Sequence, residues 1–298
     1  MIVAQFYDRT GPHVGLRHRT GWIDYGKARA LDAMLKQGTP VEEITTVTEL
    51  LERGLFSPDE FRRVVNTVIA DRMDRAVRIA TDAKMGAPLR RPRKIVALGL
   101  NYARHAKEGN FAVPKEPIIF MKAGSSVIGP DDTVRIPRGM GRMDHEVELA
   151  AVIGSEATRV AKRDAWKHVA GYTICNDVTA RDVQTKDLEQ KHPWFRSKSF
   201  DTFTPLGPWI VTADEFPRSV HLTVECRVNG RIRQKANTRN LVFDIPRIIE
   251  FVSRHITLEA GDVISTGTPE GIGPIVGGDM MECRIERIGV LRNPVRWR

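Results

Sequence analysis

The chain has 298 residues, of which 41% are hydrophobic, and a formal net charge of +9. This length fits one large domain or two unequal ones with a well-buried core. No apolar run approaches the roughly 20 residues that span a bilayer, and the first apolar run ends at Asp8. We therefore expect a globular cytoplasmic protein that is neither secreted nor membrane-bound, with Cys175, Cys226 and Cys283 as reduced thiols.

The excess of 46 basic over 37 acidic residues raises the question of nucleic-acid binding. Except in residues 89–94 and at the C-terminus, the arginines are scattered singly, and no basic motif interleaved with aromatic residues accompanies them. We expect no nucleic-acid partner and no membrane partner. A positive surface also suits a small anionic substrate.

Residues 1–90 differ in pattern from the rest of the chain. Short strand-like pieces broken by Gly and Pro are followed by a stretch with helical spacing, in which a Ser-Pro-Asp sequence beginning at Ser57 marks a helix start. Gly and Pro then cluster in residues 85–94, which predicts a linker. We expect a small N-terminal α/β domain over residues 1–90 and a second domain over residues 91–298.

From Ile95 onward, apolar runs bounded by Gly, Pro and Asp predict strands, and long helical patterns are few. One helix is expected within residues 243–262. The predicted fold class is therefore mixed α/β and mostly β. The expected strands lie in residues 95–102, 117–124, 147–154, 169–177, 207–214, 222–230, 262–269 and 280–289.

Two glutamates, Glu146 and Glu148, stand at the start of one of these strands, just before the apolar residues 149–153. Because side chains alternate along a strand, both carboxylates point to the same face. Carboxylates this close repel each other unless a cation lies between them, and hard oxygen ligands favour magnesium, manganese or calcium. This segment alone leaves open a pair of solvent-facing glutamates on an edge strand.

A third oxygen donor could come from Asp177, at the end of another apolar strand. Arg181 and Gln184 follow at helical spacing, so they would share one face with Asp177 if the chain turns into a short helix. An Arg and a Gln beside a metal would bind the oxygens of an acidic substrate. An N-capping Asp followed by a surface ion pair explains the same segment equally well.

His105 and Glu108 are spaced to meet on a helical turn, where the carboxylate would orient the imidazole as a general base. Lys122 and Lys198 lie beside apolar strand residues, where a charge needs a partner. Residues 266–274 are rich in Gly and Pro, and the backbone N–H groups of such a turn could bind a carboxylate or an enolate oxygen. A structural histidine, lysines that reach the surface and a plain turn are the ordinary alternatives.

The order of these segments along the chain adds information that no single segment carries. The segments are IVALGLNYARHAKE, PIIFMKAGSSVIGP, DHEVELAAVIG, GYTICNDVTARDVQ, KSFDTFTPLGPWI and DVISTGTPEGIG. Together they resemble the fumarylacetoacetate hydrolase family, from about Arg93 to the C-terminus. The resemblance implies a largely β catalytic domain of roll or sandwich type, usually paired into dimers, that binds magnesium or manganese through three carboxylates. The preceding residues look like the variable extra domain of many members.

Carried over residue by residue, the resemblance implies a complete site. Its metal ligands would be Glu146, Glu148 and Asp177, its catalytic residues His105, Glu108, Lys122 and Lys198, and its substrate-binding residues Arg181, Gln184 and Thr268. The sequence departs from the family at His145, where many members have Tyr. This position is not a ligand position, so the departure does not affect the expected metal site.

The implied activity is that of a Mg- or Mn-dependent hydrolase that cleaves a carbon–carbon bond in an acylpyruvate-like or other 2,4-dioxo acid. His105 and Glu108 would activate water, and the metal would stabilise the enolate. The same site would serve an oxaloacetate decarboxylase, or an isomerase and decarboxylase of 2-hydroxyhepta-2,4-diene-1,7-dioate from aromatic catabolism. A non-enzymatic protein that binds anions or nucleic acid is the alternative from another class.

Overall fold

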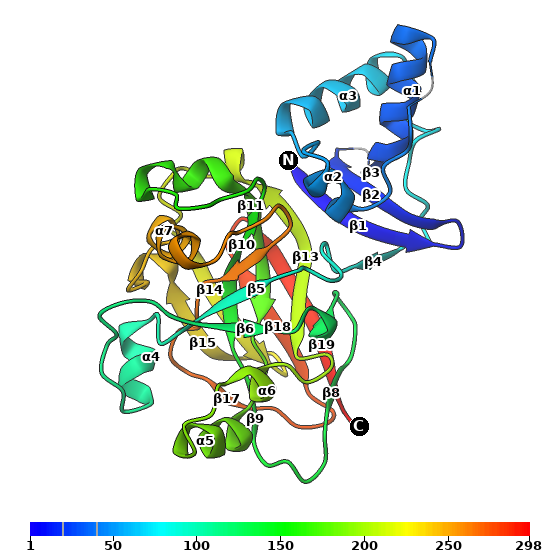
Figure 1. Ribbon diagram of the computed structural model, residues 1–298. Helices are drawn as coiled ribbons and strands as arrows, with labels where there is room; N and C mark the ends of the chain where they lie inside the picture. Colours follow the sequence, from blue (N-terminus) through cyan, green and yellow to red (C-terminus); the bar gives the residue numbers. More distant parts are fainter. Residues whose placement is uncertain (20, 40) are drawn as a thin grey trace.

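The computed structural model describes residues 1–19, 21–39 and 41–298. Strands outnumber helices and form three sheets (Figure 1), which confirms the expected mixed and mostly β fold. The main, 11-stranded sheet has the order β3 (Gly21–Asp24), β2 (Gly11–His18), β1 (Ile2–Asp8), β13 (Thr204–Thr212), β11 (Val169–Asn176), β10 (Val147–Ile153), β16 (Val263–Ser265), β5 (Ile95–Gly99) and β6 (Ile118–Lys122), with β4 (Lys84–Gly86) beside β1 and β7 (Val127–Ile128) beside β13.

Two smaller sheets complete the β structure. The 5-stranded sheet has the order β15 (Arg231–Asn237), β14 (Thr223–Val228), β18 (Met280–Ile285), β19 (Gly289–Trp297) and β8 (Val134–Ile136). The 3-stranded sheet has the order β12 (Thr179–Ala180), β9 (Met143–His145) and β17 (Gly273–Pro274).

Side-chain caps mark the starts of several helices. Ser57 accepts a hydrogen bond from the backbone N–H of Glu60 at 3.3 Å and starts α3, as its sequence predicts. Asp244 does the same for Arg247 at 2.9 Å and starts α7, the helix expected within residues 243–262. The α-helices are α1 (Tyr25–Gln37), α2 (Val47–Glu52), α3 (Pro58–Ala70), α4 (Ala103–Glu108), α5 (Arg181–Glu189), α6 (Phe195–Lys198) and α7 (Ile245–His255).

Strand β10 is buried on both faces because it lies between two hydrophobic cores. It pairs with β11 on one side and with β16 on the other. Leu149 and Ala151 pack in one cluster with α7, whereas Ala150 and Val152 pack in a second cluster with the N-terminal elements. A strand covered on both faces reads as a continuous apolar run, which explains the sequence after Glu148. The two cores fix the position of this strand.

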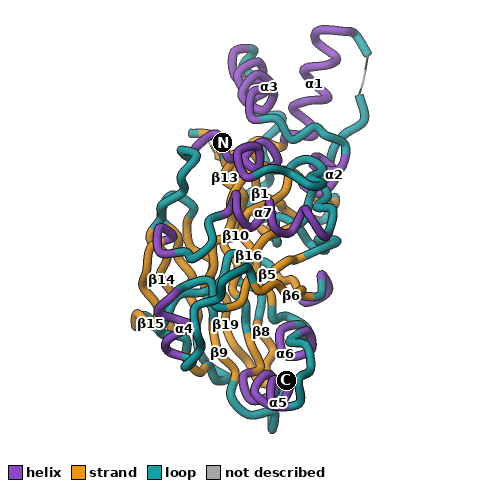
Figure 2. The backbone as a smooth tube through the Cα atoms, turned by 60° about the vertical axis from the view of Figure 1, so that its left-hand side comes forward, coloured by secondary structure: helices purple, strands orange, loops and turns teal. Residues whose placement is uncertain are grey.

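The N-terminal part extends the main sheet, since β1 pairs with β13 through Ile2 opposite Val211 and Val3 opposite Ile210. The expected linker over residues 85–94 is packed against the sheet, because β4 pairs with β1 and Leu89 is buried. Figures 1 and 2 show α1 and α3 at one end of the molecule, and α5 and α6 at the other. A domain division near residue 90 remains a proposal.

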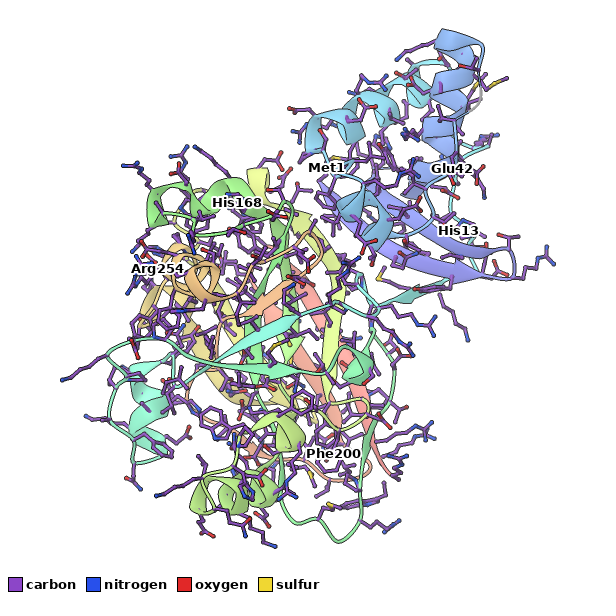
Figure 3. The ribbon with its side chains drawn as sticks, viewed as in Figure 1. Met1, His13, Glu42, His168, Phe200 and Arg254 are labelled. Atoms are coloured by element: carbon purple, nitrogen blue, oxygen red, sulfur yellow. The ribbon has the colours of Figure 1, made fainter. Side chains whose placement is uncertain are left out.

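Polar contacts also join the N-terminal part to the end of β13. Met1, which lies at this junction in Figure 3, donates from its amino group to Thr212 Oγ1 and to Glu215 Oε1, both at 2.7 Å. Arg62 on α3 donates to Asp214 at 2.8 Å. These contacts lie far from the candidate site residues on α5 and α6.

The pairing of β10 with β11 brings two of the predicted ligands together. It sets Val147 opposite Asn176 and Glu148 opposite Cys175. One step further, the backbone N–H of Asp177 donates to the carbonyl oxygen of Glu146 at 2.8 Å. The chain then turns into β12 and α5, a short helix of the kind that the spacing of Arg181 and Gln184 allowed.

Candidate active site

Three buried carboxylates form the centre of the site. Glu146, Glu148 and Asp177 each offer an oxygen atom within 4.8 Å of the others. Their exposed fractions are 4%, 1% and 1%, so the pair of solvent-facing glutamates considered from the sequence is excluded. Three oxygen ligands in one buried cluster are the donor set that magnesium or manganese prefers, and they could hold such a cation.

Two buried lysines neutralise part of this charge. Lys198 Nζ donates to Glu146 Oε2 at 2.8 Å and to Asp177 Oδ2 at 2.6 Å. Lys122 Nζ donates to Asp177 Oδ1 at 2.6 Å and also to the carbonyl oxygen of Lys198. Burial disfavours the charge of Glu146, but Lys198 and Arg181 outweigh it and hold the pKa of that carboxyl well below its usual value.

Glu148 is held by neutral donors. Its Oε2 atom accepts hydrogen bonds from Ser265 Oγ at 2.6 Å and from the backbone N–H of Gly267 at 2.8 Å. Burial and the neighbouring charge of Asp177 raise the pKa of Glu148 to about 8. Additional positive charge at the cluster would favour its ionised form, so the site fits a divalent cation.

Arg181 connects the cluster to α5 and to a further buried carboxylate, that of Asp144. Its guanidinium donates to Glu146 Oε1, to Gln184 Oε1 at 2.5 Å and to Asp144 Oδ2 at 2.8 Å. Asp144 is fully buried and also accepts from Arg142 Nε at 2.6 Å. The N-cap alternative for Asp177 is therefore wrong, because α5 begins after Ala180 and has no side-chain cap.

His105 and Glu108 meet on α4 as their spacing predicts. His105 Nδ1 lies 3.2 Å from Glu108 Oε2, and Glu108 Oε1 accepts from the backbone N–H of Gly271 at 3.0 Å. The Glu108 carboxylate thus joins α4 to the Gly-rich turn. With a proton on Nδ1, the imidazole has Nε2 available as a base.

A cavity of about 300 Å³ opens beside Glu146. It lies between α4, α5, the end of β5 and the chain before α6. The predicted site residues that line it are His105, Glu146, Arg181, Gln184, Lys198 and Thr268. Asp177 and Lys122 are hydrogen-bonded to Lys198 behind the cavity wall. Glu148 is held by Ser265 and Gly267, which do not line the cavity, and Glu108 lies against His105.

Thr268 is held in place by a buried amide that the sequence did not reveal. Gln234 on β15 donates to Thr268 Oγ1 at 2.7 Å and to the carbonyl oxygen of Pro269 at 2.8 Å. Its own carbonyl oxygen accepts from the backbone N–H of Val147 at 3.1 Å and lies 3.0 Å from His145 Nδ1. Gln234 therefore links the Gly-rich turn to the strand that carries the carboxylates.

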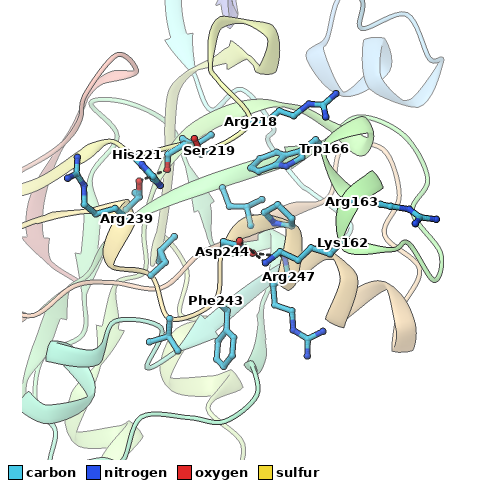
Figure 4. A pocket seen from close by; sticks show the side chains of 16 residues that line it. Lys162, Arg163, Trp166, Arg218, Ser219, His221, Arg239, Phe243, Asp244 and Arg247 are labelled. Atoms are coloured by element: carbon cyan, nitrogen blue, oxygen red, sulfur yellow. Dashed lines mark hydrogen bonds and ion pairs between the residues drawn. The ribbon is translucent and has the colours of Figure 1, made fainter.

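A larger hollow of about 820 Å³ lies beside the start of α7 (Figure 4). Figure 4 shows Arg163 and Arg239 on opposite sides of it, with their guanidinium groups pointing away. Its carboxylate, Asp244, caps α7 and pairs with Lys162 at 2.9 Å. The diverging cations provide no common binding point, so volume does not mark this hollow as catalytic.

Comparison with known proteins agrees with the geometry. The model of the fumarylacetoacetate (FAA) hydrolase C-terminal domain matches residues 94–296. The chain belongs to the fumarylacetoacetate hydrolase family. The matched residues include the three carboxylates, His105 and Glu108.

Several similar members of the family are enzymes. The chain is 40% identical over 294 residues to the mitochondrial oxaloacetate tautomerase of Bos taurus, covering 96% of this chain and 88% of that protein. A solved 2-hydroxyhepta-2,4-diene-1,7-dioate isomerase from Mycobacterium marinum is 29% identical, with a TM-score of 0.73 and coverage of 100% and 99%. A maleylpyruvate hydrolase from Sphingobium sp. SYK-6, solved with manganese(II) and pyruvate, is 32% identical, with a TM-score of 0.74 and coverage of 100% and 99%.

The fumarylacetoacetate hydrolase family therefore includes hydrolases, isomerases and tautomerases on closely similar folds. Across the part of the chain that the structure describes, no helix is both long and apolar enough to span a membrane.

Proposed function

We propose that this protein is a Mg- or Mn-dependent hydrolase that cleaves a carbon–carbon bond of an acylpyruvate or a related 2,4-dioxo acid. One observation carries the proposal: His105, oriented by Glu108, lines the same cavity as Glu146 and Lys198. A candidate general base and one carboxylate of the buried cluster thus face the same small cavity. The maleylpyruvate hydrolase solved with manganese and pyruvate supports this choice of reaction and cofactor.

Glu146, Glu148 and Asp177 would hold the cation. When bound, it supplies Lewis-acid chemistry to two oxygens of a 2-oxo acid. Lys122 and Lys198 orient Asp177, and Lys198 also pairs with Glu146. Arg181 and Gln184 would bind the oxygens of the substrate from the side of α5.

The reaction adds one water molecule. His105 Nε2 would take a proton from water while Nδ1–H donates to Glu108, and the water oxygen would bond to the C4 carbonyl carbon. The C3–C4 bond then breaks and its electron pair passes to C3 as an enolate, next to the Lys198 ammonium. The proton on His105 returns to C3. The products are pyruvate and the carboxylic acid derived from the acyl group.

A second candidate keeps the site and changes the reaction. The 40% identity to an oxaloacetate tautomerase over 96% of the chain favours proton transfer at C3 of oxaloacetate, with or without decarboxylation. His105 would then move a proton between carbon and solvent, and no water would be consumed. The hydrolase and isomerase neighbours likewise leave open the 2-hydroxyhepta-2,4-diene-1,7-dioate reaction.

A substrate panel tests the proposal. Purified protein with magnesium or manganese is mixed with 2,4-dioxopentanoate, oxaloacetate or a dienedioate, and the products are quantified. Hydrolysis predicts equal amounts of pyruvate and acetate from 2,4-dioxopentanoate, and loss of turnover with a chelator. Carbon dioxide release or a change in enol content alone would favour the second candidate.

The assembly and location of the protein are part of the same proposal. Following the family resemblance, we propose a homodimer in the cytoplasm that acts on a small anionic 2-oxo acid. Sedimentation equilibrium of the purified chain tests the dimer, because a single species of 33.5 kDa would contradict it.

A further inference from the structure

The cavity beside Glu146 changes in character along its length. Arg181, Gln184 and Leu188 line it from successive turns of α5. Because a helix rises 1.5 Å per residue, the seven steps from Arg181 to Leu188 cover about 10 Å. The α5 wall of the cavity therefore runs from a charged inner end at the carboxylates to an apolar outer end.

Two aromatic side chains form another part of the cavity wall, and the ring of Phe120 reaches the inner end, where Lys198 Nζ lies 5.1 Å from its centroid. The rings of Phe120 and Trp194 meet edge to face, with centroids 5.4 Å apart and an angle of 65° between their planes. The carbonyl oxygen of Trp194 accepts from Ser197 Oγ at 2.8 Å and from the backbone N–H of Lys198 at 3.2 Å. A single helical turn thus fixes the aromatic wall and the buried ammonium relative to each other.

Gly99 makes room for this wall. A Cβ atom at Gly99 would lie 2.5 Å from the Trp194 ring, closer than real Cβ contacts allow. The backbone of Gly99 does not have a positive φ, so space rather than conformation requires glycine here. The end of β5 and the indole ring are packed directly against each other.

Among the described residues that line this cavity, the arginine and lysine side chains are Arg181 and Lys198, both at the inner end. Arg181 already donates to Asp144, Gln184 and Glu146, and Lys198 is held between two carboxylates. A substrate carboxylate at the outer end would lose water without gaining a cationic partner. An apolar group there would be buried against aromatic and aliphatic side chains at no such cost.

We propose that the substrate carries a neutral, apolar alkyl or aryl substituent beyond its two reacting oxygens, and that this substituent lies against Leu188 and Trp194. The inference rests on the proposed function, in which a 2-oxo acid binds at the inner end. It names the substrate class as monocarboxylic acylpyruvates with an apolar tail. Oxaloacetate would leave the outer end unfilled, and longer dicarboxylates would place a charge there.

A matched pair of non-cleavable ligands tests this inference by binding alone. The probes are 2-oxoglutarate and 5-methyl-2-oxohexanoate, in which an isopropyl group replaces the second carboxylate. Their dissociation constants are measured by calorimetry with the full chain and manganese. We expect 5-methyl-2-oxohexanoate, whose tail is uncharged, to bind at least about tenfold more tightly.

One variant and its control locate the effect. Leu188→Arg introduces a cation at the outer end and should reduce the preference for 5-methyl-2-oxohexanoate by about tenfold or more. Gln190→Arg makes the same change in charge at the C-cap of the same helix, outside the cavity, and should leave the preference unchanged. Leu188 is 39% exposed, so the variant is expected to fold, which circular dichroism checks.

The outcomes separate this inference from the proposed hydrolysis. Equal or tighter binding of 2-oxoglutarate by the unmodified protein would overturn the inference, as would binding of neither probe. If the probes bind as expected but 2,4-dioxopentanoate is not hydrolysed, the preference for an apolar substituent is supported and the proposed hydrolysis is contradicted. If acylpyruvates are hydrolysed but 2-oxoglutarate binds more tightly, the proposed hydrolysis is supported and the preference for an apolar substituent is contradicted.

Discussion

The carboxylate cluster and helix α4 serve the same cavity but are held in different ways. Glu146, Glu148 and Asp177 are buried, bonded to cations or sheet donors, and fixed by paired strands. Helix α4 has six residues, and its carboxylate reaches the Gly-rich turn through one hydrogen bond from Gly271. Sites with few buried contacts open at low cost, whereas paired core strands do not. The position of the three carboxylates thus depends on the paired strands of the main sheet. The proposed proton transfer by His105 depends on α4, a short helix that can open separately.

Of the substitutions considered, Glu148→Ala in the carboxylate cluster should cause the largest loss of activity. It removes one ligand and leaves the Ser265 and Gly267 donors without their acceptor. We expect kcat/KM to fall by about 1,000-fold or more, together with manganese affinity. Titration calorimetry and steady-state kinetics measure the two losses. Exposed Glu116→Ala is the control, and full activity with the metal still bound in Glu148→Ala would contradict the ligand assignment.

His105→Ala tests the contribution of helix α4. Loss of the general base should lower kcat by about 100-fold or more while manganese affinity and the unfolding midpoint stay unchanged. Lys107→Ala on the same helix is the control, since this side chain is exposed and outside the cavity. A matching loss of metal affinity would mean that α4 and the carboxylate cluster are not separable.

Asp144→Asn tests whether the buried carboxylate beside Arg181 contributes to the stability of the fold as well as to the site. The substitution keeps the shape of a fully buried side chain but removes the charge that faces Arg181 and Arg142. We expect a loss of roughly 1–3 kcal/mol in the free energy of unfolding and a higher KM through a misplaced Arg181. Urea denaturation and kinetics measure these changes. Exposed Asp131→Asn is the control, and unchanged stability would show that Arg181 is held by Glu146 and Gln184 alone.

Glu108→Gln should have the smallest effect. The amide oxygen can still accept from Gly271, so α4 stays attached, but His105 loses an anionic partner. We expect kcat to fall by about tenfold with no change in thermal stability. A loss as large as that of His105→Ala would indicate that the carboxylate takes a proton itself.

Local patterns predicted the parts of this molecule that depend on neighbours along the chain. Alternation along a strand put Glu146 and Glu148 on one face, and the Ser-Pro-Asp sequence at Ser57 marked the start of α3. The proximity of Asp177 depends on the register of β10 against β11. No local pattern contains that register: the position of Asp177 at a strand end made it a candidate, and the family resemblance selected it as the third ligand.

Long-range contacts explain what the sequence did not reveal. Gln234 is bonded to Val147 and to Thr268, which lie far from it along the chain, and nothing around it marks it as part of a site. The catalytic role predicted for Lys122 stays a prediction, because this lysine contacts Asp177 from behind rather than lining the cavity. The apolar outer end likewise combines side chains from separate elements.

The position of β10 between two cores has a consequence for refolding. A slip of one residue against β11 would exchange the faces of the strand, so that Val147 and Leu149 would take the positions of Glu146 and Glu148. A sheet formed with that error could still show native-like circular dichroism, yet it would lack the three-carboxylate cluster. Recovery of manganese binding after dilution from urea would therefore report the alignment of a single strand pair.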